Sequence, residues 1–180
     1  IVRPLNFFGP RMDFIPGRDG EGVPRVLACF MTALLDGAPM QLVDGGAARR
    51  TIVSIEDAID AIALMLEKPD RAANQIFIIG NRDNEVTMAE LADRMRRIYA
   101  DITGDASYMN HPIQSVSGAE FYGPGYEDCD RRMPSIDKAR ELLGWEPKIK
   151  LDDALRTTMV HFHELYGARE AAAFTKAKTA

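Results

Sequence analysis

The stretch Gln75-Ile76-Phe77-Ile78-Ile79-Gly80-Asn81 indicates the fold class of this chain. Its apolar residues run almost continuously instead of alternating, and Gly80-Asn81 ends the run. A strand of this kind is typically covered on both faces, as in a parallel sheet flanked by helices. Helical patterns lie on both sides of it along the chain, so the sequence predicts an α/β fold.

Two capping signals predict the helices on either side of this strand. Ser54, with Asp57 three residues later, resembles a capping box, and Thr87 with Glu90 forms another that opens a helix to about Tyr99. The helix after Ser54 carries an apolar stripe made of Ile55, Ala58, Ile59, Ile62, Ala63 and Leu66.

Before residue 54 the pattern predicts one helix and a pair of strands. A polar, glycine-rich loop covers 11–23, and apolar residues then recur at helical spacing from Pro24 to a stop at Gly37. Short strands follow at Met40–Val43 and Arg50–Val53. The turn Asp44-Gly45-Gly46 between them predicts a hairpin.

After the second capping box, long-range order is harder to predict. Residues 101–134 indicate mostly irregular structure. We expect Ser135 to cap a short helix that Gly144 ends, and a last helix over about 151–166. The Ala/Lys-rich residues 168–180 lack a clear apolar face and are expected to form a flexible tail, which leaves 1–167 as the folded unit.

Composition excludes several classes of protein. The 180 residues are 46% hydrophobic and 27% charged, which is typical of a globular chain and not of a disordered one. The net charge of −5 gives no overall basic surface for nucleic acid. Cys29 and Cys129 lie far apart without a CxxC pair, which indicates a reducing, cytoplasmic location and no zinc site. No apolar run reaches the ~18–20 residues needed to span a bilayer.

The first residues predict that the chain is part of a longer polypeptide. Ile1-Val2 begin an apolar strand at once, without Met or a polar lead-in. Natural chain ends usually fray in solvent, whereas this one has the pattern of a buried strand. We therefore expect an exposed apolar edge, and either homo-oligomers or contact with a missing N-terminal half.

The histidines do not form a catalytic cluster. His161 and His163 are two residues apart on a helix and point about 200° apart, so they cannot chelate one metal together. His111 precedes Pro112 in a loop. All three are interpreted as structural or surface residues, and no metal site is expected. The chain also lacks GxxGxxG and GxGxxG, so it has no usual dinucleotide pyrophosphate loop.

The arginines carry the more informative pattern. Arg25 starts a helix, Arg49-Arg50 opens a strand, and Arg131-Arg132 ends a long loop. Guanidinium groups bind phosphate and carboxylate through paired, charge-assisted hydrogen bonds. The alternative is a solvated surface charge in each case, paired with acidic residues such as Glu127, Asp128 and Asp130. Composition and spacing leave both readings open.

Five segments in register resemble the extended short-chain dehydrogenases/reductases that act on nucleotide sugars. They are Arg3–Pro10 (RPxNxxGP), Arg50–Asp57 (R-x-F-x-x-[IV]-x-D, with Ile52 in place of Phe), Asn74–Asn81 (a strand ending in GN), Thr87–Leu91, and Met133–Arg140 with Leu143–Pro147 (PxIxKAR…LGWxP). This resemblance implies the C-terminal half of an extended Rossmann-type enzyme, with the last sheet strands and the small substrate-binding subdomain. NAD and the catalytic Tyr and Lys would lie upstream of residue 1.

Within that family the chain resembles the UDP-glucuronate decarboxylases most, in particular the branch that serves lipid A aminoarabinose modification and polymyxin resistance. The segment Tyr122–Ser135 is similar to their YGxGYxDxxxRxPS loop, and Gln41–Arg50 to their LIDGG…R segment. The implied reaction is oxidation of the sugar at C4 followed by loss of the C6 carboxylate. We expect no turnover from residues 1–180 alone.

The resemblance assigns roles to individual residues. Arg132 is implied as the catalytic residue that holds the glucuronate carboxylate, while Arg25 and Arg50 would bind the diphosphate. Asn6 would contact the diphosphate or the sugar, and Tyr126 would hydrogen-bond the ligand. A segment that wraps the uridine and ribose consists of Gln41, Leu42, Val43, Asp44, Gly45 and Gly46.

Other functions remain open from the sequence. The protein could be another nucleotide-sugar epimerase or dehydratase, or a UDP-xylose synthase. A non-catalytic UDP-sugar-binding module is the alternative from a different class. The expected partner in every case is a UDP-sugar, with no nucleic acid and no membrane.

Overall fold

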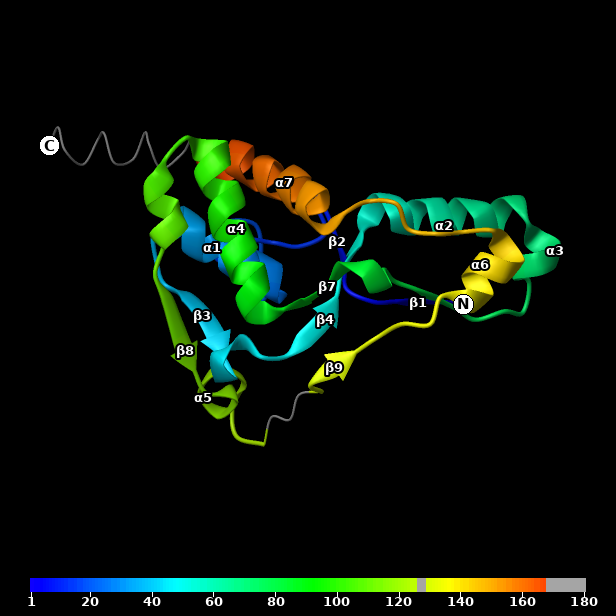
Figure 1. The fold of residues 1–180 in the computed structure, drawn as a ribbon, viewed down its shortest axis with the longest axis horizontal. Coiled ribbons are helices and arrows are strands. Elements are labelled where there is room, and N and C mark those ends of the chain that lie inside the picture. The colour runs from blue at the N-terminus through cyan, green and yellow to red at the C-terminus, as the bar shows by residue number, and fades with distance from the viewer. Residues whose placement is uncertain (126–128, 168–180) are drawn as a thin grey trace, which may run out of the picture.

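The computed structural model describes residues 1–125 and 129–167. The predicted tail at 168–180 and the predicted ligand contact of Tyr126 lie outside the described residues. The α/β class is confirmed, with short sheets and helices alternating along an elongated molecule (Figure 1). The principal helices are α1 (Val26–Asp36), α2 (Ile55–Glu67), α3 (Pro69–Ala72), α4 (Met88–Thr103), α5 (Gly118–Tyr122), α6 (Asp137–Leu143) and α7 (Leu151–Phe162).

Parallel pairing dominates the described strands. β1 (Val2–Pro4) pairs in parallel with β6 (Phe77–Ile79), β2 (Phe7–Phe8) with β5 (Val53–Ser54), and β3 (Met40–Val43) with β8 (Ile113–Val116). A three-stranded sheet has the order β7 (Glu85–Thr87), β4 (Arg49–Thr51), β9 (Arg131–Arg132), in which β4 is antiparallel to β7 and parallel to β9.

Two clusters of buried side chains hold the molecule together. The larger lies where α1, α4 and α7 pack, on the left of Figure 1, and includes Phe30, Met95 and Phe162. The smaller lies between α2, α6 and β6 on the right, around Trp145 and Phe77. The β7–β4–β9 sheet lies between these two bodies in Figure 1, so its residues are placed at their junction.

Local signals in the sequence predicted helix ends well. Thr87 and Glu90 form the full capping box, with Glu90 N–H donating to Thr87 Oγ1 at 3.0 Å and Thr87 N–H to Glu90 Oε2 at 2.9 Å. Gly37 and Gly144 end α1 and α6 in the left-handed conformation. The last helix continues past α7 as a π-helical turn over His163–Gly167.

Two capping predictions need correction. Ser54 does cap α2, but Asp57 does not complete a box, because its buried carboxylate instead accepts the backbone N–H groups of Lys148 and Ile149. Ser135 does not cap α6, since its hydroxyl donates to the side chain of Asp137 at 2.6 Å.

The buried carboxylate sets which face of α2 points inward. Asp57, Ala58 and Ala61 face Trp145, whose indole N–H donates to the backbone oxygen of Asp57 at 2.9 Å. The larger apolar side chains of the predicted stripe therefore stay exposed: Ile59 at 55%, Ile62 at 40% and Leu66 at 78%. Association through the apolar sheet edge predicted from the sequence remains a prediction.

The predicted hairpin between residues 40 and 53 is wrong. β3 and β4 pair with strands that come much later in the chain, β8 for the first and β7 and β9 for the second. Between them Asp44, Gly45 and Gly46 all have positive φ, at 47°, 73° and 72°. This run of three left-handed residues, a 3₁₀ turn, carries the chain past α4 instead of reversing it.

Residues 101–134 are more ordered than predicted. α4 extends to Thr103, a 3₁₀ turn follows at Ala106–Asn110, and β8, α5 and β9 all fall within this range. Local propensity misses β8 and β9 because β3 and β4 supply their hydrogen-bond partners from more than 70 residues away.

Candidate functional site

A cavity of about 720 Å³ lies where β2, β3, β4, β9 and the start of α1 meet. Most of the residues predicted to bind the ligand line it, although they come from distant parts of the chain: Asn6, Arg25, Gln41, Leu42, Val43, Asp44, Arg50 and Arg132. Gly45 and Gly46 are not part of the lining. The three arginines named from sequence thus share one cavity.

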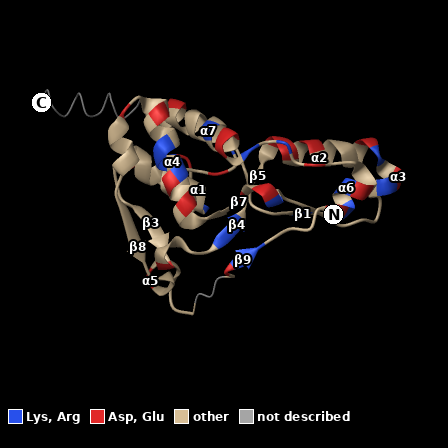
Figure 2. Cartoon of the chain, viewed as in Figure 1, with Lys and Arg blue, Asp and Glu red and all other residues tan. Residues whose placement is uncertain are grey.

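Strand register explains how two of these arginines come together. In the parallel β4–β9 pair Arg50 is opposite Arg132 and Arg49 is opposite Arg131. Successive side chains of a strand point to opposite faces, so each doublet is split. Arg50 and Arg132 line the cavity, whereas Arg49 and Arg131 do not. Figure 2 shows the basic residues of β4 and β9 next to each other.

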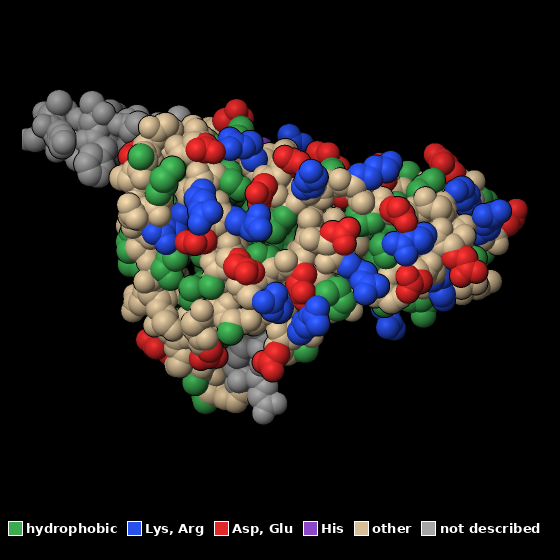
Figure 3. Space-filling view, viewed as in Figure 1, with side chains coloured by type: hydrophobic (Ala, Val, Ile, Leu, Met, Phe, Trp, Pro, Cys, Tyr) green, Lys and Arg blue, Asp and Glu red, His purple; other side chains and the backbone are tan. Residues whose placement is uncertain are grey.

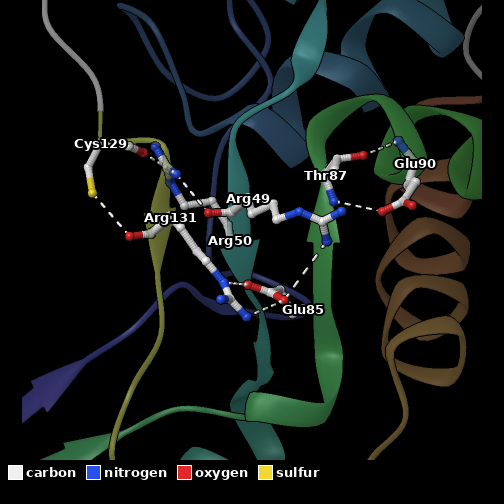
Figure 4. Close-up of polar contacts among 7 residues, drawn as sticks. All are labelled: Arg49, Arg50, Glu85, Thr87, Glu90, Cys129 and Arg131. Carbon is white, nitrogen blue, oxygen red and sulfur yellow. Dashed lines mark hydrogen bonds and ion pairs between the residues drawn. The ribbon is translucent and has the colours of Figure 1, made fainter.

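Glu85 of β7 binds the two arginines that face away from the cavity. Arg131 donates to both carboxylate oxygens, from Nε to Oε1 at 2.5 Å and from Nη2 to Oε2 at 3.0 Å (Figure 4). Arg49 Nη1 lies 3.9 Å from Oε2. The hydrogen bond from Arg131, assisted by the charges of both arginines, lowers the pKa of Glu85, and the same bond raises the pKa of Arg131.

Arg50 also holds β9 in place. Its Nη1 donates to the backbone oxygens of Arg49 and Cys129, at 2.7 Å each (Figure 4). The Arg49 backbone N–H donates to Asp130 O at 2.8 Å. Strand β9 is therefore attached to β4 by backbone and guanidinium bonds together.

Arg25 makes more hydrogen bonds to nearby residues than the sequence suggested. Its Nε bonds to Asp13 Oδ2 at 3.0 Å, and its two terminal nitrogens donate to the backbone oxygens of Phe7 and Met12. These bonds attach the 7–13 loop to the start of α1. Arg25 shapes the cavity wall, and its phosphate contact stays a prediction.

Asn6 has a structural task as well. Its φ of 48° lies in the left-handed region, which asparagine tolerates better than most residues. Its Nδ2 donates to Thr51 O at 2.7 Å and thereby joins the turn after β1 to the end of β4. The amide lines the cavity. Because Nδ2 is bound to Thr51 O, the predicted bond to a ligand would be made by the other polar atoms of Asn6.

The 41–46 segment is fixed by contacts with neighbouring elements. The Leu42 side chain is 7% exposed and belongs to the larger core. Asp44 accepts the backbone N–H of Gly118 at 3.2 Å, and the Gly45 N–H donates to Ser115 Oγ at 3.2 Å. Gly46 packs on α4, where an added Cβ would lie 2.8 Å from Ala89 N. This turn is thus shaped by its contacts with β8, α4 and α5.

Sequence reasoning missed the apolar part of the lining. Phe8, Phe30 and Tyr122 line the cavity, and Cys29 is there too. Burial, with the nearby charge of Asp13, raises the pKa of the Cys29 thiol to about 11, so this cysteine is a packing residue and not a nucleophile. The aromatic residues have no spacing signal of their own, although Phe8 and Tyr122 lie inside the motifs quoted above.

The histidines occupy structural positions where the structure shows their contacts. His111 is buried with Nε2 at 2.7 Å from Ala38 O, and His163 Nδ1 lies 3.1 Å from the hydroxyl of Tyr99. Across residues 1–125 and 129–167 no group of three or more His, Cys, Asp or Glu could hold a metal ion. In the same ranges no helix combines the length and apolar character needed to cross a membrane.

Charges are mixed on the face that Figure 3 shows. Basic and acidic side chains alternate there instead of gathering in one basic area. The basic cluster that matters is therefore the local one at β4 and β9.

The described residues contain neither GxxGxxG nor GxGxxG, and the junction from β5 to α2 is closed by the Ser54 side chain, which accepts the Glu56 N–H. We assign no cofactor-binding residue to this part of the chain.

Comparison with known proteins shows what the chain is similar to. Residues 1–80 match the model of the NAD dependent epimerase/dehydratase family. Over 168 residues, 92% of the chain, it is 52% identical to a UDP-D-apiose/UDP-D-xylose synthase of Oryza sativa subsp. japonica and 51% identical to UDP-D-apiose/UDP-D-xylose synthase 1 of Arabidopsis thaliana. The chain spans only 42% and 43% of the length of these relatives.

Solved structures agree with the fold. The PbgP3 protein from Burkholderia pseudomallei superposes with a TM-score of 0.74 at 27% identity, over 93% of this chain and 46% of that one. A UDP-glucose 4-epimerase from Thermotoga maritima, solved with UDP-glucose, gives a TM-score of 0.69 at 28% identity over 91% of this chain and 45% of that one. The Rossmann-like fold class is thereby confirmed. The narrower prediction of the aminoarabinose branch is not what the curated relatives above support.

Proposed function

We propose that residues 1–167 form the UDP-sugar-binding part of an NAD-dependent enzyme that decarboxylates UDP-glucuronate, of the UDP-apiose/UDP-xylose synthase type. The observation that carries this proposal is the placement of Arg50 and Arg132 opposite each other, both lining one cavity of about 720 Å³. The identity of 51–52% to UDP-D-apiose/UDP-D-xylose synthases supports the choice within the family.

Arg50 and Arg132, two of the three arginines that line the cavity, suit a ligand with two separate anionic groups. A UDP-sugar carries a diphosphate, and a glucuronate adds a carboxylate at the other end of the sugar. Arg50, on the inner strand β4, would neutralise the diphosphate, while Arg132 of β9 would hold the carboxylate through paired hydrogen bonds. A neutral sugar would leave the second cation without a partner in the ligand.

The role of Arg132 follows from the chemistry of the substrate. NAD, bound by the rest of the protein, supplies the oxidation of the C4 hydroxyl to a ketone. The C6 carboxylate is then β to a carbonyl, so its C–C bond can break to release CO₂ while the electron pair passes to an enolate at C4. A fixed guanidinium beside the developing charge stabilises this step, and a guanidinium group is a poor proton donor. Arg132 is therefore assigned to carboxylate positioning and charge stabilisation.

The apolar wall contributes by excluding water. Phe8, Phe30 and Tyr122 reduce the contact of the cavity with solvent, which strengthens the attraction between the arginines and an anionic ligand. The half-buried Cys29 adds to this wall without titrating near neutral pH, because its pKa is about 11.

The test uses the full-length protein with UDP-glucuronate and NAD. We expect release of CO₂ together with UDP-xylose and UDP-apiose, identified by NMR, and no net accumulation of NADH. Accumulation of a UDP-4-keto-pentose with one NADH per CO₂ would instead assign the aminoarabinose-type reaction. Interconversion of UDP-sugars without CO₂ would assign an epimerase and refute the proposal.

Binding measurements test the separate roles of the two arginines. Titration calorimetry of the full-length protein should show UDP and UDP-glucuronate competing for one site. The variant Arg132→Gln should keep UDP binding but weaken UDP-glucuronate, because only the latter carries the carboxylate. Equal loss for both ligands would contradict the separate roles of the two arginines.

A further inference from the structure

Glu85 binds a neighbour of the cavity lining without being part of that lining. Its side chain is 17% exposed, and both of its carboxylate oxygens accept hydrogen bonds from Arg131, the residue next to Arg132. In Figure 4 the Arg50 side chain reaches toward Cys129, whereas the Arg131 side chain reaches toward Glu85.

Strand β9 is very short and is attached to β4 by the bonds from Arg50 to Cys129 O and from Arg49 N–H to Asp130 O. It consists of two residues, each with a single partner on β4, Arg49 for Arg131 and Arg50 for Arg132. In the described part of the chain no further strand lies beyond β9 in this sheet. Because side chains alternate along a strand, a rotation of β9 that released Arg131 would also turn Arg132 out of the cavity.

Glu85 itself is placed by the middle of the sheet. It lies opposite Thr51 in the antiparallel β4–β7 pair, two positions from Arg49 on the same face. This is the diagonal geometry in which long side chains of neighbouring strands interact. Glu85 thus bridges β7 to β9 across β4.

We propose that Glu85 is a positioning residue, which binds Arg131 and thereby holds β9 in the register that directs Arg132 into the cavity. This inference rests on the proposed function for the meaning of Arg132, but the geometry it describes is independent of the reaction. The lowered pKa of Glu85 agrees with a carboxylate that stays charged throughout the neutral range. Arg131 supplies a planar fork that a lysine does not reproduce.

The experiment compares four forms of the full-length protein with the wild type. Glu85→Gln keeps the size and removes the charge, Arg131→Lys keeps the charge and removes the fork, and the double exchange of Glu85→Arg with Arg131→Glu reverses the pair. The matched control is Glu146→Gln, which removes an exposed pair with Arg140 that lies outside the cavity lining.

A positioning role predicts a split between kinetic constants. We expect kcat for CO₂ release to fall about ten-fold or more in Glu85→Gln, since a small misplacement of a reacting group costs up to about 10²-fold. The affinity for UDP should stay unchanged, and the reversed pair should recover part of the lost rate. A kcat for Glu85→Gln equal to that of Glu146→Gln, or an equal loss of UDP affinity and kcat, overturns the proposal.

A second measurement does not need the reaction. Backbone hydrogen exchange at Arg131 and Arg132, measured without ligand, should be faster in Glu85→Gln than in the wild type and unchanged in Glu146→Gln. If the protein releases no CO₂ from UDP-glucuronate, the proposed function fails, and exchange alone then decides the role of Glu85. Exchange in Glu85→Gln that matches the wild type overturns it.

Discussion

Asp57 is the residue whose replacement the structure predicts most quantitatively. Its carboxylate is 2% exposed, and its two oxygens accept the backbone N–H groups of Lys148 and Ile149 at 2.9 and 3.0 Å. In Asp57→Ala both N–H groups lose their acceptor. A hydrogen bond to a charged group contributes about 1.5–3 kcal/mol, so loss of the two bonds should lower the free energy of unfolding by about 3–6 kcal/mol. Asp57→Asn retains one acceptor oxygen and should lose about half of that.

Trp145 makes this loss measurable. It is the single tryptophan of the chain, it is 2% exposed, and its indole donates to the Asp57 backbone oxygen. Urea unfolding of residues 1–180, followed by tryptophan fluorescence, therefore reports on the affected region directly. The control is Asp60→Asn, an exposed position one turn along the same helix. A difference below about 0.5 kcal/mol between Asp57→Ala and this control would refute the assignment, since surface changes stay within that range.

Three further outcomes follow from the same structure. The pKa of Glu85 is lowered from 4.5 in the folded state by its arginine partners, so the stability difference between wild type and Glu85→Gln should be present above pH 4.5 and shrink as the pH falls below it, measured by urea unfolding at several pH values. Gly46→Ala should lower Tm more than Gly45→Ala, because both have positive φ but only at Gly46 would the new Cβ meet the α4 backbone at 2.8 Å. Iodoacetamide at pH 8.5 should modify the exposed Cys129 well before Cys29, whose pKa is about 11, as peptide mapping would show; equal rates would contradict the burial of Cys29.

The candidate site was only partly predictable from sequence. The arginine doublets pointed to anion binding, and the family resemblance selected Arg50 and Arg132, both of which line the cavity. Nothing in the sequence showed that the Arg25 guanidinium donates hydrogen bonds to the backbone oxygens of Phe7 and Met12. The function of Glu85 was equally hidden, because its partner Arg131 lies 46 residues away.

Features that depend on a few neighbouring residues were determined by the sequence alone. Examples are the Thr87–Glu90 capping box, the left-handed glycines that end α1 and α6, and the apolar run of β6. Each of them depends on a few consecutive residues, so propensity and pattern suffice to predict it.

Strand partners were decided only by the tertiary structure. β3 could have paired with β4 across a tight turn, and the local sequence favoured that hairpin, yet β8 and β9 provide the pairing instead. A strand's hydrogen-bonding groups are the same along every chain, so sequence cannot distinguish one distant partner from another. Which arginine of each doublet enters the cavity depends on that choice, because a register shifted by one residue exchanges the two faces of a strand.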